Sequence, residues 1–441
     1  MQYKSYFCFF IFLLISTAGF NLLSAQNPSF PVRIDTLFIV GNEITKNQVI
    51  LREIPYSLPD TLDEADFRII RNRLQNLYLF NRVQLHLSQF RRRNALIIEV
   101  SESWYFFPVP VLFINEHDWD KISYGVQLTH YNFRGRNEKL HLGGWLGYNP
   151  NLYLSYFNPW LGGKKRLIFG ISFFYKERQN KIFDLNEQRS GFSWTLGKKL
   201  SLKLQTRFSF SLERIRLPGS FREFSASGDN TDWMPTLSYE ITWDNRDLYE
   251  FPRRGIYSRS NILRSGFNSR QPEFWRLTLD NRAYHPVYKK FAVGFRHLLV
   301  VNEGKLPVYD RSFLGYGDRI RGYFNRVFPD PDKYRRYNSA DVSLASVELR
   351  FPLLPIRYFS IENGPVIPQL YRDLKFGISG TLFIDSGIAW QKTAEIRSEN
   401  LFTGFGAGLN FHLPYVYVFR LEHAWNDKWQ SQWIVDMNVS F

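Results

Sequence analysis

The chain has 441 residues with a formal net charge of +15, and 18% of its residues are aromatic. Its single cysteine, Cys8, lies in an apolar N-terminal stretch, which excludes disulfides and thiolate metal sites from the rest of the chain. Beyond residue 25 no run of about eighteen apolar residues occurs, which excludes a membrane-spanning helix there.

Residues 1–25 have the pattern of a signal peptide. Lys4 is followed by an apolar run at residues 6–15. Residues 23–25, Leu-Ser-Ala, predict cleavage before Gln26, although the leucine is larger than the small residue preferred there. We therefore expect the remaining chain to leave the cytoplasm.

Three basic clusters stand at residues 91–93, 164–166 and 333–336. Such clusters can bind nucleic acid, but an exported protein rarely meets it. We expect them to contact anionic outer-membrane lipid or to form solvated turns, and we expect no nucleic-acid partner.

Residues 32–103 read as a small soluble α+β domain, within the ordinary size range. Helical spacing of apolar residues follows a capping box predicted at residues 61–64. The expected elements are a strand at 35–40, a helical turn or two at 45–52, the capped helix, and strands at 83–87 and 95–100.

From residue 104 onward the helical period disappears, and strand candidates recur at about twenty-residue spacing, enough for a tilted membrane-spanning strand and a connection. Sixteen candidates follow in order: 104–114, 122–131, 139–148, 152–158, 166–175, 191–196, 201–212, 233–243, 255–263, 274–285, 291–301, 343–351, 374–385, 402–413, 416–424 and 433–441.

The last candidate strand alternates most clearly, with Trp433, Val435, Met437, Val439 and Phe441 on one face. A chain rich in aromatic residues, with a mean hydropathy of -0.30, fits apolar outward and polar inward faces. This pattern favours a closed membrane barrel over the alternative, a large secreted β-sandwich.

An even number of strands places both ends of the barrel on the side of the soluble domain, which we expect to be the periplasm. The connection at residues 302–342 is then the sixth extracellular loop, and its length suggests a function or disorder. A second irregular connection, at residues 352–373, is expected on the periplasmic side.

Within the long loop, Ile320, Arg321, Gly322 and Tyr323 resemble a motif of a known family. It is the sixth-loop motif of the BamA/TamA superfamily of outer-membrane assembly and translocation barrels, which carry periplasmic POTRA domains. Four further matches stand in family order, at residues 100–102, at 132–136, at 244–247 with 252–255, and at 383–387. The resemblance implies a 16-stranded antiparallel transmembrane β-barrel at residues 104–441 with one small N-terminal α+β POTRA-like domain.

The resemblance also implies a contact between Arg321 and the strand that bears Asp385. Alternation through residues 374–385 places Asp385 on the lumenal face, where a guanidinium fork can meet it. Gly322 permits close backbone approach, and Glu348 and Arg350 on the preceding strand can extend the network. The alternative is that Arg321 and Asp385 are unrelated solvated charges.

Pro108 and Pro110 suggest an incomplete seam beside the last strand. Because proline lacks a backbone donor, closure between residues 104–114 and 433–441 is short of hydrogen bonds if both prolines face that strand. Phe107 and Asn438 would flank such a seam, which an incoming strand could join. Alternatively, the prolines merely mark the linker before the barrel.

Phe441 is expected in the same seam. It resembles the terminal aromatic residue that outer-membrane barrels present for their own insertion. On that reading Phe441 serves the insertion of this chain and is not a functional site.

The sequence has few patterns that indicate catalysis. The eight histidines show no metal-ligand spacing, and neither a Gly-x-Ser-x-Gly elbow nor a phosphate loop occurs. A lipase or protease site assembled from distant residues remains an alternative. We expect no enzyme, no metal and no cofactor.

The resemblance implies an assembly factor that helps polypeptides insert into the outer membrane through a lateral seam. Client outer-membrane or exported polypeptides and accessory periplasmic proteins are the expected partners. A strand edge of the soluble domain, at residues 35–40 or 83–87, would receive the client. The alternative is a pore that translocates one dedicated partner, a reading that the single soluble domain keeps open.

Overall fold

The computed structural model describes residues 30–90, 93–114, 120–180, 185–312, 314, 320–323, 340–362, 367–415, 418–437 and 441. The expected signal peptide, Asn438, Val439 and the basic cluster at 333–336 lie outside the described residues. Within the described ranges, no helix is long and apolar enough to cross a membrane.

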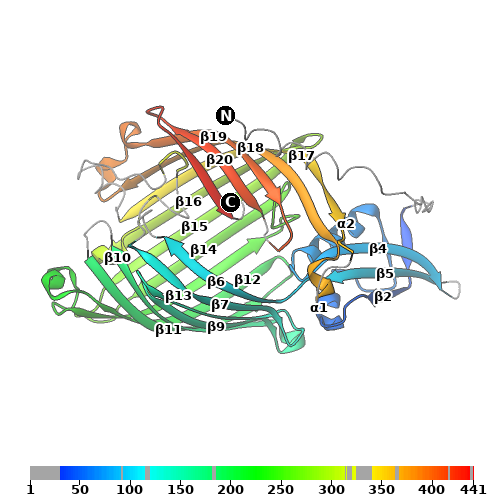
Figure 1. Cartoon of the computed structure of the whole chain (residues 1–441), viewed down its shortest axis with the longest axis horizontal. Coiled ribbons are helices and arrows are strands. Elements are labelled where there is room, and N and C mark those ends of the chain that lie inside the picture. The colour runs from blue at the N-terminus through cyan, green and yellow to red at the C-terminus, as the bar shows by residue number, and fades with distance from the viewer. Residues whose placement is uncertain are drawn as a thin grey trace, which may run out of the picture.

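Sixteen strands form one antiparallel sheet in which neighbours in sequence are neighbours in space, and Figure 1 shows it curled around a lumen. The expected sixteen-stranded antiparallel fold is confirmed. The strands are β6 (Phe106–Ile114), β7 (Ile122–Phe133), β8 (Glu138–Gly147), β9 (Asn151–Leu161), β10 (Leu167–Asn180), β11 (Leu185–Lys199), β12 (Leu204–Arg216), β13 (Thr231–Asp244), β14 (Gly255–Ser265), β15 (Phe274–Tyr288), β16 (Phe291–Gly304), β17 (Asp341–Phe359), β18 (Leu374–Trp390), β19 (Phe402–His412), β20 (Phe419–Asn426) and β21 (Ser431–Met437).

The two faces of the sheet differ in polarity because side chains alternate along each strand. On β18, Leu382 and Ile384 are exposed on the outer face, whereas Thr381 and Asp385 are buried on the inner face. Short 3-10 turns occur in the connections, at η2 (Gly163–Lys165), η3 (Gly219–Phe224), η4 (Val308–Asp310), η5 (Pro368–Leu370), η6 (Thr393–Glu395) and η7 (Ser398–Asn400).

The connection predicted to start at Pro352 is wrong in its first eight residues, because β17 continues to Phe359. Its ladder with β18 shifts register between Pro352 and Leu354 and again between Leu354 and Arg357. Bulges of this kind accommodate proline within a strand, since the extra residue needs no ladder partner. The irregular connection is therefore shorter than the prolines suggested.

The N-terminal α+β domain consists of β1 (Val32–Ile34), β2 (Thr36–Val40), α1 (Asn47–Leu51), β3 (Asp60–Leu62), α2 (Glu64–Gln75), β4 (Phe80–Phe90) and β5 (Arg93–Glu102). Its main sheet has the order β2-β5-β4, so β2 and β4 are both edges. Phe67, Ile70 and Leu74 of α2 are buried in the domain core. The capping box differs from the predicted one, because Asp63 and Asp66 exchange hydrogen bonds at the start of α2.

The domain sits at one end of the barrel, which we call the domain end (Figure 1). Two of the motifs noted in the sequence form turns that touch it. In the β7–β8 turn, the Gly135 carbonyl accepts a hydrogen bond from the Lys46 amide at 2.9 Å. In the β13–β14 turn at residues 245–254, Asn76 of the domain donates to the Asp247 carbonyl at 3.0 Å and accepts from the Tyr249 amide at 2.9 Å.

A third contact joins the start of β4 to the β17–β18 connection. The Asn81 amide donates to the Arg372 carbonyl at 2.9 Å, and Arg82 pairs with Asp373 at 3.2 Å. The domain is thus held at three separate points around the barrel rim, which fixes its orientation over the lumen.

Candidate functional site

Arg321 lies inside the barrel with 1% of its surface exposed. Its guanidinium binds Asp385 of β18 with both prongs: Nε donates to Oδ2 and Nη2 donates to Oδ1, each at 2.7 Å. The backbone amide of Arg321 donates to the same carboxylate at 3.1 Å. A bidentate contact of this kind fixes the orientation of the side chain as well as its position.

The third guanidinium nitrogen of Arg321 joins two more strands. Nη1 donates to Glu348 of β17 at 2.7 Å and to Glu422 of β20 at 2.9 Å. The Phe383 ring lies 3.5 Å from the guanidinium carbon, on the same face of β18 as Asp385. One loop side chain therefore connects the inner faces of β17, β18 and β20.

The buried network around Arg321 is balanced in charge. Glu348 also accepts from Arg350, and Glu422 also accepts from Arg420, each at 2.7 Å. Three guanidinium groups thus meet three buried carboxylates, counting Asp385 and Arg321, and Arg420 also pairs with the more exposed Asp436 of β21 at 3.1 Å. Such balance matters because an unpaired charge in a buried site is strongly destabilising.

Two glycines allow the loop backbone to reach the wall. Gly322 has a φ of +100°, and a Cβ there would lie 2.8 Å from the Trp425 carbonyl oxygen. A Cβ on Gly404 of β19 would lie 1.8 Å from the carbonyl oxygen of Arg321. Tyr323 completes the contact, because its hydroxyl bonds Asp427 and its ring packs edge-on against Phe402.

Phe441 does not lie in the seam, and that expectation is wrong. Phe441 is buried in the lumen with 1% of its surface exposed. Its carbonyl accepts a hydrogen bond from Arg350 at 2.9 Å, and its ring stacks on Tyr284 at 6.3 Å. The physical reason is the buried Arg350 guanidinium, for which Phe441 supplies both an acceptor and an aromatic face.

Pro108 and Pro110 of β6 turn their nitrogens away from β7. The Tyr131 amide donates to the Tyr105 carbonyl at 2.9 Å, so residue 105 and every second residue after it face β7. The prolines occupy the other set, whose backbone groups face the free side of β6. In the part of the chain that the structure describes, no ladder joins β6 to β21.

Phe107 lies on the inner face of β6. Its ring packs against Tyr131 of β7 and against Tyr415 in the β19–β20 connection, at 5.7 and 5.8 Å. The second contact bridges from the first strand of the barrel to a connection near its last strands. Phe107 therefore stands beside the open edge, while Asn438, expected across from it, is outside the described residues.

A hydroxyl, an imidazole and a carboxylate also meet in the lumen. Ser379 lies 2.9 Å from His412 Nε2, and Glu250 lies 3.2 Å from His412 Nδ1. This order resembles a catalytic triad. Both Ser379 and His412 are buried, the Phe251 ring covers the imidazole, and Glu250 also pairs with Lys375. The arrangement anchors the β13–β14 turn to the wall.

The described residues lack the arrangement that a metal site requires. Among the described residues, no group of three or more His, Cys, Asp or Glu side chains is placed to hold an ion. The carboxylates of the buried network are all engaged by guanidinium groups. The contacts of Arg321 join the loop segment to the inner faces of β17, β18 and β20.

Comparison with known proteins identifies the family. Residues 132–433 match the model of the Omp85 superfamily domain. The chain belongs to the Omp85 superfamily. The resemblance seen in the sequence motifs is thereby confirmed, and this Omp85 protein is an outer-membrane barrel whose domain end faces the periplasm.

Individual relatives are distant. The outer membrane protein assembly factor BamA of Nitratidesulfovibrio vulgaris (strain Hildenborough) is 20% identical over 415 residues, which are 89% of this chain and 49% of the relative. This Omp85 chain thus spans about half the length of the curated relative that it matches.

Two solved structures share the fold. BamA from Haemophilus ducreyi lacking POTRA domains 1–3 has a TM-score of 0.55 at 16% identity, covering 92% of this Omp85 chain and 83% of that one. CdiB from Escherichia coli has a TM-score of 0.53 at 13% identity, covering 91% and 75%. At these identities the likeness concerns the fold alone.

Proposed function

We propose that this protein is an outer-membrane assembly factor that helps polypeptides insert through a lateral seam between β6 and β21. The observation that carries the proposal is the edge of β6, where Pro108 and Pro110 remove two backbone donors from the side that would meet β21. Because this edge lacks two backbone donors, it forms fewer hydrogen bonds with β21 and can open to pair with another strand. Membership of the Omp85 superfamily supports the same role.

In the proposed mechanism the N-terminal domain acts as a POTRA-like receiver. Both β2 and β4 are sheet edges, so either can pair with an extended client segment. The client then passes to the edges of β6 and β21, and from there into lipid. Strand pairing matters at this step, because an unpaired backbone in hydrocarbon carries a severe energetic penalty.

The buried network holds the rest of the barrel while the seam opens. Arg321 ties β17, β18 and β20 together, and Arg350 ties β17 to Phe441 and to the Pro252 carbonyl of the β13–β14 turn. No bond is made or broken in this mechanism, and no cofactor takes part. Client polypeptides, accessory periplasmic proteins and outer-membrane lipid are the proposed partners.

The test is photo-crosslinking in cells from two seam positions, Phe107 on β6 and Val435 on β21. Ile241, an outward-facing residue of the internal strand β13, is the matched control. We expect adducts to several nascent barrel proteins from both seam positions and none from Ile241. If the seam positions give no polypeptide adduct while the protein folds normally, the proposal is wrong.

A second candidate is translocation of one dedicated partner through the lumen. It is favoured by the position of residues 320–323, a loop segment that occupies the lumen and is held there by the buried side chains of Arg321 and Tyr323. If the lumen is the path, deletion of residues 315–330 should open a large conductance in planar bilayers. An unchanged conductance in a barrel that still folds would count against this candidate, and adducts to a single exported polypeptide would support it.

A further inference from the structure

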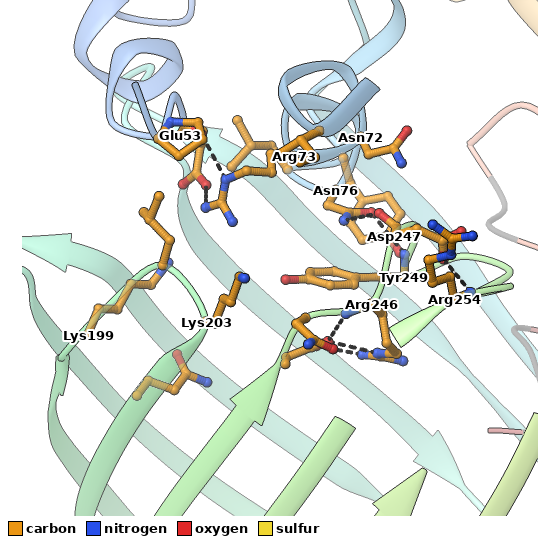
Figure 2. Close-up of a pocket in the computed structure, with 18 of the residues that line it drawn as sticks. Glu53, Asn72, Arg73, Asn76, Lys199, Lys203, Arg246, Asp247, Tyr249 and Arg254 are labelled. Carbon is orange, nitrogen blue, oxygen red and sulfur yellow. Dashed lines mark hydrogen bonds and ion pairs between the residues drawn. The ribbon is translucent and has the colours of Figure 1, made fainter. Parts of the chain in front are cut away.

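A cavity of about 1000 Å³ lies between the N-terminal domain and the domain end of the barrel. Figure 2 shows α2 and the segment after α1 above it, with Lys199 and Lys203 of the barrel rim below. The Tyr249 ring, from the β13–β14 turn, points into the space between Arg73 and Arg246. The cavity therefore stands where a segment leaving the domain would enter the barrel.

The lining of this cavity is strongly basic. Ten of its side chains are Arg or Lys and three are Asp or Glu. The three acids are already engaged. Glu53 binds Arg73 at 2.5 Å, Asp244 binds Arg246 at 2.7 Å, and Asp247 accepts backbone amides of its own turn.

Most of the basic side chains have no acidic counterpart. Arg73, Arg207 and Arg246 form ion pairs, whereas the other seven form none with any residue that the structure describes. The Nε atoms of Arg207 and Arg253 are buried without a hydrogen-bond partner among these residues. Buried donors of this kind normally have partners, so a ligand with several acceptors fits the cavity.

Apolar and aromatic side chains are interleaved with the charges. Ile69 and Leu77 come from the domain, Phe157 and Leu202 from the barrel, and Tyr249 from the β13–β14 turn. The Tyr249 ring adds an aromatic face to the lining, and burial raises the pKa of its hydroxyl, which is neutral at pH 7 in any case. A site that mixes apolar and cationic groups suits a peptide with both kinds of side chain better than a free inorganic anion.

The barrel wall separates the cavity from lipid. Lys199 and Arg207 lie on the inner face of β11 and β12, while their neighbours Leu196 and Phe208 are exposed on the outer face. A lipid head group would have to leave the bilayer to reach these cations. A polypeptide that passes from the domain to the lumen would meet them directly.

We infer that this cavity binds an acidic segment of the client polypeptide, with carboxylates on the unpaired cations and apolar side chains on the interleaved surface. The inference rests on the proposed function for the identity of the ligand. Long-lived binding is not required, because opposite charge mainly steers encounter and fixes orientation. The client class is then one with an acidic and apolar stretch near the part that enters the barrel first.

The test is binding of fluorescent peptides to the purified full chain in detergent micelles, measured by fluorescence anisotropy. One peptide alternates Asp and Glu with Leu and Val, and the other replaces the acids by Asn and Gln. The double variant Lys199→Gln/Lys203→Gln removes two cavity charges. We expect it to weaken binding of the acidic peptide by about tenfold or more.

The matched control is Lys164→Gln/Lys165→Gln, which removes two exposed charges from the neighbouring η2 turn outside the cavity. Its affinity should equal that of the unchanged protein. Arg68→Gln, on the exposed side of α2, is a second cavity variant that leaves the barrel untouched. It should also weaken binding of the acidic peptide.

Three results would overturn the inference. The first is equal affinity for the acidic and the neutral peptide, and the second is equal weakening by the η2 control. The third is binding of phosphatidylglycerol vesicles, but not peptide, that Lys199→Gln/Lys203→Gln abolishes, because that would assign a phosphate-bearing lipid.

Failure of the cavity and failure of the proposed function are distinguishable. Normal seam adducts from Phe107 with no peptide binding would refute the cavity alone. Peptide binding without any seam adduct would refute the insertion role and leave the cavity as a peptide site.

Discussion

The wall around Arg321 and the seam between β6 and β21 are built in opposite ways. In the wall, β17 and β18 have 19 and 17 residues, and their inner face carries a charge-balanced network. At the seam, the described parts of β6 and β21 have 9 and 7 residues, and two of the nine in β6 are prolines. Longer ladders contribute more hydrogen bonds, each of which stabilises by about 1 kcal/mol net.

One barrel can therefore combine a rigid wall with an edge that opens. Local stability in a protein varies from almost nothing up to the global free energy of unfolding. Here Arg321 concentrates stabilising contacts on β17, β18 and β20, next to the seam but not across it. Strands β6 and β21 can then separate without breaking the contacts that Arg321 makes with β17, β18 and β20.

The largest loss of stability and activity is expected from Arg321→Ala, which removes the side chain that connects the strands of the wall. The change leaves Asp385 without its bidentate partner and removes one partner each from Glu348 and Glu422. Removing one partner of a buried ion pair typically costs about 3–5 kcal/mol. We expect a lower thermal midpoint and weaker assembly activity, with all sixteen strands retained in circular dichroism. Arg321→Lys, which keeps charge without the fork, should be intermediate, and unchanged stability and activity in Arg321→Ala would refute the role.

A smaller loss of stability in the same wall is expected from Phe441→Ala. The ring loses its stacking on Tyr284 and its contact with the Arg350 guanidinium, 5.2 Å from the ring centroid. Aromatic and cation–π contacts of this kind contribute about 2 kcal/mol together. Differential scanning calorimetry should show destabilisation, while Phe441→Tyr, which keeps a ring, should lose less. Equal loss in both variants would contradict a specific role of the ring.

The link between wall and domain is tested by Asn76→Ala. Asn76 exchanges two hydrogen bonds with the β13–β14 turn, and their loss should cost about 1–2 kcal/mol of docking free energy. We expect faster amide exchange in that turn and in α2. Asn72→Ala, one helical turn earlier, is the matched control and should leave exchange unchanged. The same exchange rates in both variants would place the docking elsewhere.

Tighter closure of the seam is expected from Pro108→Val/Pro110→Val. Two restored donors on the free edge of β6 should strengthen closure by about 1 kcal/mol, since each new bond competes with water. Client adducts from Phe107 should decrease. Pro235→Val in the internal strand β13 is the control and should leave adducts unchanged. An increase of adducts in the double variant would show that the prolines do not weaken the seam.

Period-two alternation was sufficient to predict the sixteen strands and the lumenal position of Asp385. It failed at Phe441, because alternation alone places residue 441 on the seam strand, whereas the folded chain buries its ring in the lumen against Tyr284 and Arg350. Glu422 was missed as a partner of Arg321, although Arg420 and Glu422 alternate with apolar residues on the same strand. That alternation indicates that Glu422 faces the lumen, but only the folded barrel brings it to Arg321, 101 residues away in the sequence.

The cavity at the domain end was beyond sequence reasoning for the same reason. Its charges come from α2, from the ends of several strands and from the β13–β14 turn, and no single segment carries the cluster. The motifs at residues 132–136 and 244–247 were visible in the sequence, but their contact with the domain was not. Alternation along a strand predicts which face each side chain lies on. Contacts between the barrel turns and the N-terminal domain depend on segments that are far apart in the sequence.

Amide hydrogen exchange of the full chain in lipid nanodiscs measures whether the barrel has a rigid wall beside an edge that opens. We expect amides of β21 to exchange about 100-fold faster or more than those of β17 and β18, equivalent to about 2.8 kcal/mol in opening free energy. Uniform protection across β17, β18 and β21 would contradict it.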